Sequence, residues 1–208
     1  MLECQQPKLF EDEAKTLIGD LEISLLACVL KAEETWNAVC EAFPEVRIAA
    51  RGRGRNALFN ELVAENARNA FAGNDRVRLA EKYGSVRLFV HQSLDCGFKK
   101  VDKKGRSSSY PTKRHRRYIN QMRLFGEPMQ DAVRLHIGYQ WNESATKILN
   151  VSIIYPQGRQ PSWLYSIMSA ASADAKPILI PTPQQVVATK SMFKSTLIED
   201  KEVKKVGQ

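Results

Sequence analysis

The chain has 208 residues, of which 43% are hydrophobic and 26% charged, with a formal net charge of +8. This composition predicts one substantial folded domain and excludes general disorder. The longest apolar run, 21–30, is about half the length of a membrane span, the amino-terminal residues are polar, and the four cysteines have no metal-binding spacing. These features predict a reduced, cytoplasmic protein that does not enter a membrane.

The first third of the chain predicts two helices. Apolar residues recur at three- and four-residue steps over 11–43, and Pro44 ends that pattern. A second apolar stripe follows the arginine–glycine segment 51–55 and continues to Phe71, before Gly73 and Asn74. Two amphipathic helices with a short link predict an antiparallel pair or a helical layer over a sheet.

The period then changes to alternation, which is typical of strands. A strand is predicted over 86–93, and 94–102 is expected to continue it past a bend at Gly97. The segments 132–141 and 146–156 predict a hairpin with one apolar and one polar, solvent-wetted face. The residues expected to face the core are Val133, Leu135, Ile137, Tyr139, Leu149, Val151, Ile153 and Tyr155.

A short helix is predicted between those strands, starting near 111–112 with Thr112 as its cap. Its inward stripe comprises His115, Tyr118, Ile119, Met122 and Phe125. Gly126 and Pro128 are expected to end it.

Together these elements predict an α+β fold. The expected domain covers 1–168, with a helical part over 1–73 and a sheet part over 84–168. The sheet part is predicted to hold three to four antiparallel strands and one intervening basic helix. Residues 169–208 are small-residue, proline-rich and charged, and predict a linker and a mobile tail.

The excess positive charge is concentrated between Phe98 and Arg117, while the rest of the chain is balanced in charge. Such a local footprint predicts a nucleic-acid partner, gripped through its phosphates by a basic loop and a helix start. RNA and single-stranded DNA are slightly favoured over duplex DNA, because Tyr110 is placed to stack on a base. The expected binding residues are Lys99, Lys100, Lys103, Lys104, Arg106, Tyr110, Lys113, Arg114, Arg116 and Arg117.

Several other interpretations stay open. The basic run could meet an acidic protein or be merely solvated. A metal-independent ribonuclease could use His91, His136 and Arg134 as acid, base and phosphate-stabilising group, if the fold brings them together. An interaction subunit could use the apolar, proline-flanked segment 176–187 as an added strand. The sequence holds no nuclease carboxylate cluster, P-loop or dinucleotide fingerprint, so binding without catalysis, cofactor or metal is favoured.

Overall fold

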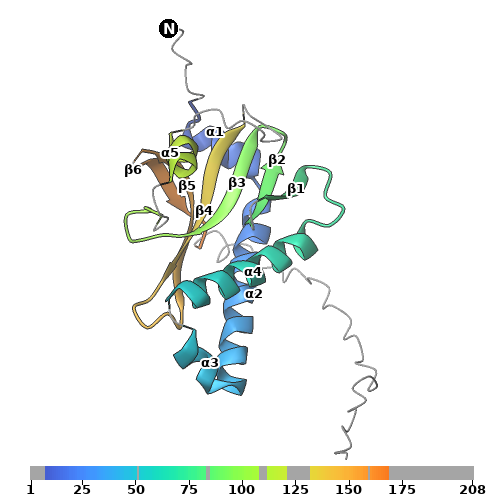
Figure 1. Cartoon of the computed structure of the whole chain (residues 1–208). Helices are drawn as coiled ribbons and strands as arrows, with labels where there is room; N and C mark the ends of the chain where they lie inside the picture. Colours follow the sequence, from blue (N-terminus) through green and yellow to red (C-terminus); the bar gives the residue numbers. More distant parts are fainter. Residues whose placement is uncertain are drawn as a thin grey trace, which may run out of the picture.

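The computed structural model describes residues 8–50, 52–82, 85–107, 112–120, 132–158 and 160–168 (Figure 1). Within these ranges, four helices precede a sheet of six strands, and a fifth helix is inserted between two of the strands. The helices are α1 (Glu11–Ile18), α2 (Leu21–Ala42), α3 (Pro44–Ala49), α4 (Gly52–Ala70) and α5 (Lys113–Ile119). The strands are β1 (Val77–Lys82), β2 (Ser85–Val90), β3 (Leu94–Lys100), β4 (Val133–Trp141), β5 (Ile148–Gln157) and β6 (Gln160–Ser166). The predicted α+β class is therefore confirmed.

The predicted helix over 11–43 is divided in two. Gly19 has a φ of 50°, in the left-handed region that a glycine adopts without strain, and its N–H still donates to the carbonyl of Lys15. Asp20, at the start of α2, forms an ion pair with Arg76. Pro44 ends α2 as predicted, but it also opens α3, because proline fits the first turn of a helix.

The sheet has the order β1-β2-β3-β4-β5-β6. The prediction of three to four strands missed the two edge strands, β1 and β6. It was also wrong on direction at one place, since β3 and β4 are parallel while the other neighbours are antiparallel. A parallel pair needs a long crossover connection, and residues 101–132, which include α5, supply it.

One face of the sheet forms the main hydrophobic core with α2 and α4 (Figure 1). Leu135, Ile137 and Tyr139 are fully buried there, as the alternation predicted. Trp141, at the hairpin tip, packs edge-on against Phe59 of α4 with ring centroids 4.8 Å apart. This tryptophan of β4 is therefore part of the core between the sheet and the helical layer.

Leu149 was expected in this core and is instead half exposed. The register of β4 and β5 shifts at this place, so that Gln140 pairs with Asn150 and Trp141 with Ile148. Leu149 is the extra residue of this irregularity, and Ile148 takes the buried position.

The opposite face of the sheet is polar but not solvent-wetted, which corrects the prediction. Asp95, Arg134, His136 and Ser152 are at most 4% exposed. Tyr118 of α5 lies on this face, with its ring parallel to the imidazole of His136 at 5.2 Å. The crossover helix therefore buries side chains that the hairpin pattern alone assigned to solvent.

None of the helices among the described residues is both long and apolar enough to cross a membrane. Cys28, Cys40 and Cys96 are buried free thiols, and burial raises the pKa of Cys28 and of Cys96 to about 12. These two side chains are thus held as unreactive thiols, in the manner of small apolar groups.

Candidate nucleic-acid interface

The basic loop, residues 99–107, begins with the last two residues of β3 and is closed by an isolated bridge between Val101 and Ser107. Asp102 organises its turn: the carboxylate accepts the backbone N–H groups of Lys104 and Arg106 at 2.9 Å and the Nε–H of Arg106 at 2.7 Å. The single acid of the cationic run therefore shapes the loop and neutralises Arg106. Lys103 and Lys104 are exposed beside it.

Lys99 and Lys100, at the base of the loop, are half-buried. Burial lowers the pKa of both ammonium groups, with a smaller contribution from Arg87 for Lys99 and from Arg55 for Lys100. The side chains of Lys100 and Arg55 are near enough to repel one another, so the start of α4 lies beside the base of the basic loop. The arginine–glycine segment thus extends the cationic surface through Arg53 and Arg55, whereas Arg51 lies outside the described residues.

Helix α5 contributes the remaining described cations of the run between Phe98 and Arg117. Thr112 caps it as predicted, its hydroxyl accepting the N–H of His115 at 3.1 Å. Lys113, Arg116 and Arg117 are exposed. Tyr110 and the side chain of Arg114, both expected in the interface, lie outside the described residues.

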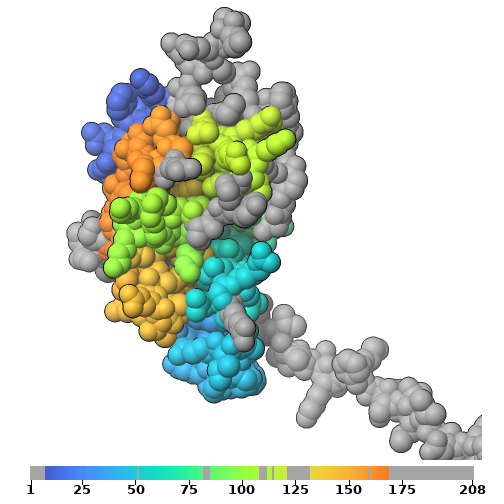
Figure 2. Space-filling model, turned by 60° about the vertical axis from the view of Figure 1, so that its left-hand side comes forward, coloured from blue at the N-terminus to red at the C-terminus, as the bar shows by residue number. Residues whose placement is uncertain are grey.

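These cations belong to a single face of the molecule. Figure 2 shows the basic loop (green), α5 (yellow-green) and the start of α4 (cyan) together on the face turned to the viewer. We call this the basic surface and define it by Arg53, Arg55, Lys99, Lys100, Lys103, Lys104, Arg106, Lys113, Arg116 and Arg117. It joins two segments separated by more than forty residues of sequence.

A buried cluster beneath α5 holds the helix against the sheet. Arg87 of β2 and Asp95 of β3 form an ion pair at 2.5 Å, with side chains 14% and 3% exposed. The guanidinium groups of Arg87 and Arg134 lie 4.6 and 5.6 Å from the ring centroid of Tyr118. The Tyr118 hydroxyl donates to the carbonyl of Leu135 at 3.1 Å. We call Arg87, Asp95, Tyr118, Arg134 and His136 the tyrosine cluster.

Sequence reasoning missed Arg87 and Asp95 as members of this cluster. Part of the signal was in the sequence, because Arg87 and Asp95 are charged residues inside otherwise apolar strands. A charged residue buried in such a strand usually has a partner of opposite charge. Their pairing depends on the β2–β3 register, in which Arg87 lies opposite Gly97 and Phe89 opposite Asp95. The absence of a side chain at Gly97 leaves room for Arg87, whose Nε would lie 3.2 Å from a Cβ built there.

The histidine pair required by the ribonuclease hypothesis is not brought together. β2 ends at Val90, and His91 stands in the following turn with a φ of 48°, exposed to solvent. His136 lies deep in the sheet opposite Gly97, and burial lowers its pKa to about 3. The prediction that both histidines share an open strand face is wrong, and an imidazole this buried is not placed to exchange protons with a substrate.

The conformation of the basic loop depends on Gly105. Its φ is 74°, and a Cβ built there would lie 2.7 Å from Cδ2 of Leu164. We expect Gly105→Ala to lower the free energy of unfolding by about 1–2 kcal/mol through backbone strain and this contact. Gly54→Ala is the control, since Gly54 is helical and a Cβ there meets nothing within 4 Å. Equal urea midpoints for the two variants would contradict the expectation.

No group of histidine, cysteine, aspartate or glutamate side chains suited to a metal ion occurs within the described ranges. What the assembled geometry can do is present fixed positive charge, on a rigid sheet and helix, to an anionic partner.

Comparison with protein-family models, curated proteins and solved structures found no match to this chain.

Proposed function

We propose that this protein binds nucleic acid through the basic surface, gripping phosphates without catalysing a reaction. The observation that carries the proposal is the convergence of the basic loop, α5 and the start of α4 on one exposed face. Within the described part of that cationic run, the single acidic residue is Asp102. Its carboxylate is already engaged by Arg106 and by the backbone N–H of Lys104, so it leaves the other cations un-neutralised.

The segments that carry the cations are held in place, which favours binding over a merely solvated loop. The Asp102 turn and the Val101–Ser107 bridge fix the loop, and Tyr118 fixes α5 on the sheet. A main chain that is already ordered loses little conformational entropy when a phosphate backbone docks. Each phosphate neutralised releases counterions, so the affinity of six to nine contacts should fall steeply with salt, with a log–log slope of roughly −4 to −8.

The test is a titration of the full chain against labelled single-stranded RNA, single-stranded DNA and duplex DNA at two salt concentrations. The variant Lys103→Ala/Lys104→Ala/Arg117→Ala removes three exposed cations of the basic surface. We expect its affinity to fall on the order of 100-fold near 0.1 M salt and its salt slope to flatten by about 2–3.

The matched control is Lys31→Ala/Arg76→Ala/Arg78→Ala, which removes three cations from α2, the turn before β1, and β1. It should retain nearly all the affinity, because β1 is the opposite edge strand from β6, against which the basic loop lies, and α2 packs on the other face of the sheet. Equal losses in both variants, or no salt-sensitive binding by the unmodified chain, would refute the proposal. The RNA recovered from the titration is also run on a gel, and specific cleavage would refute its non-catalytic part.

A further inference from the structure

A hollow with a volume of about 540 Å³ opens at the edge of the sheet, between the amino-terminal residues and β6. Phe10, Tyr155 and Trp163 supply aromatic walls, and Lys8, Gln157 and Ser162 supply polar groups. The volume lies within the roughly 300–1,000 Å³ typical of small-ligand sites, which combine apolar walls with a few polar groups. We call it the aromatic hollow.

The walls of the aromatic hollow are fixed. The ring of Trp163 stacks between those of Tyr155 and Tyr165, at centroid distances of 5.5 and 6.1 Å, and its Nε1–H donates to the Leu9 carbonyl at 2.8 Å. Phe10 is 66% exposed, although its backbone N–H is held by the Glu13 carboxylate at 3.0 Å. A phenylalanine so exposed beside ordered rings leaves an aromatic face for a planar ligand to cover.

The aromatic hollow adjoins the basic surface across a single strand. Gly105 of the basic loop lies against Pro161 and Leu164, which flank the hollow residues Ser162 and Trp163 in β6. β6 is an edge strand, and Figure 2 shows it (orange) between residues 8–18 (blue) and the basic loop (green). On the far side Lys15 lies 5.0 Å from the centroid of the Tyr165 ring and is paired with Glu11 at 2.6 Å. A chain crossing the edge thus passes directly from the basic surface to the hollow.

We infer that the aromatic hollow receives an unpaired base of a single-stranded nucleic acid whose phosphates lie on the basic surface. This inference rests on the proposed function and specifies its ligand. Every base offers a flat face to aromatic side chains, whereas the bases of a duplex are stacked and paired and cannot enter a side pocket without being flipped out. Single strands are therefore the ligand class, in preference to duplex DNA.

The test compares a base-bearing single strand with an abasic strand carrying the same number of phosphates. The full chain should bind the base-bearing strand about tenfold more tightly, since one stacked base contributes on that order. Phe10→Ala should abolish this preference and leave binding of the abasic strand unchanged, whereas Phe10→Tyr should retain it.

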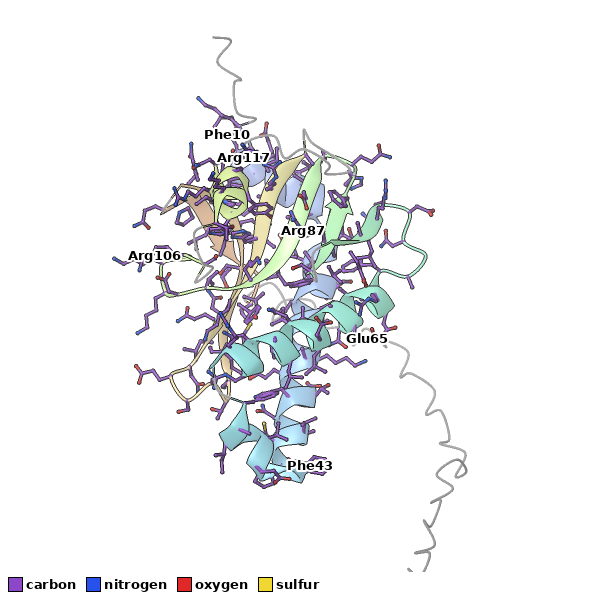
Figure 3. The ribbon with its side chains drawn as sticks, in the orientation of Figure 1. Phe10, Phe43, Glu65, Arg87, Arg106 and Arg117 are labelled. Carbon is purple, nitrogen blue, oxygen red and sulfur yellow. The ribbon has the colours of Figure 1, made fainter. Side chains whose placement is uncertain are left out.

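Phe43 provides the matched control, because it is 56% exposed and lies at the far end of the helical layer from Phe10 (Figure 3). Phe43→Ala should behave as the unmodified chain. Equal affinity for base-bearing and abasic strands, with salt-sensitive binding still lost in the triple basic variant, would overturn the base site and leave the proposed function standing. Absence of binding to every nucleic acid would overturn both, and an equal effect of Phe43→Ala would also overturn the base site.

Discussion

Asp95→Asn is expected to lower the free energy of unfolding by about 3 kcal/mol. The change removes the carboxylate charge that faces the Arg87 guanidinium at 2.5 Å, where both side chains are largely excluded from water. A buried cation that loses its counter-charge retains the full cost of desolvation, and this cost appears as lost stability. Urea unfolding measures it, with Asp102→Asn as the control, because the Asp102–Arg106 pair is exposed and should be worth less than about 1 kcal/mol.

The double variant Arg87→Met/Asp95→Leu distinguishes a lost ion pair from a damaged sheet. Removing both charges together leaves the net charge of the buried cluster unchanged, and buried pairs replaced by apolar side chains often keep or gain stability. We expect the double variant to unfold at higher urea than Asp95→Asn. Equal losses of unfolding free energy in Asp95→Asn and Asp102→Asn would mean that the Arg87–Asp95 pair is not excluded from water as described.

The parts of the fold that the sequence predicted are those set by local periodicity. The stripe of α4 and the core face of β4 follow from spacing alone, because 3.6- and 2-residue periods decide which side chains share a face. Phe59, Leu135, Ile137 and Tyr139 are accordingly buried where expected. The prediction for Leu149 was wrong because a register irregularity between β4 and β5 breaks the alternation. The hydrophobic pattern of the sequence does not indicate where such an irregularity occurs.

The polar face of the sheet was misassigned because its burial depends on a distant segment. Arg134 and His136 alternate with apolar neighbours as in a solvent-facing strand, yet Tyr118 of the crossover helix covers them. The same limit applies to the candidate interface. Its charge was visible because nine cations fall between Phe98 and Arg117, whereas Arg55 joins through packing of α4 beside Lys100. The aromatic hollow joins residues from opposite ends of the described chain, and no local pattern indicates it.

The unfolding free energy of this protein is expected to fall as the pH drops from 7 to 5, and His136 to account for a large share of that loss. Burial, followed by the charges of Lys99 and Arg87 and by His115, lowers the pKa of His136 to about 3, against an ordinary value of about 6.5. Between those two values the unfolded chain binds a proton that the folded protein excludes. The neutral imidazole therefore contributes full stability above pH 6.5 and loses about 1.4 kcal/mol per pH unit below it.

His136→Gln removes this titration while keeping a polar side chain of similar length against Tyr118. Over the range from pH 7 to pH 5, the unmodified protein should lose about 2 kcal/mol more than the variant, as measured by urea unfolding at the two pH values. His91→Gln, which replaces an exposed histidine in the turn after β2, serves as the control and should keep the slope of the unmodified protein. Parallel slopes for His136→Gln and the unmodified protein would mean that the imidazole is already reached by water and protons, and that α5 does not seal the polar face of the sheet. A steeper slope in the unmodified protein and in His91→Gln than in His136→Gln would establish that α5, which carries Lys113, Arg116 and Arg117 of the basic surface, packs over a neutral, water-excluded imidazole.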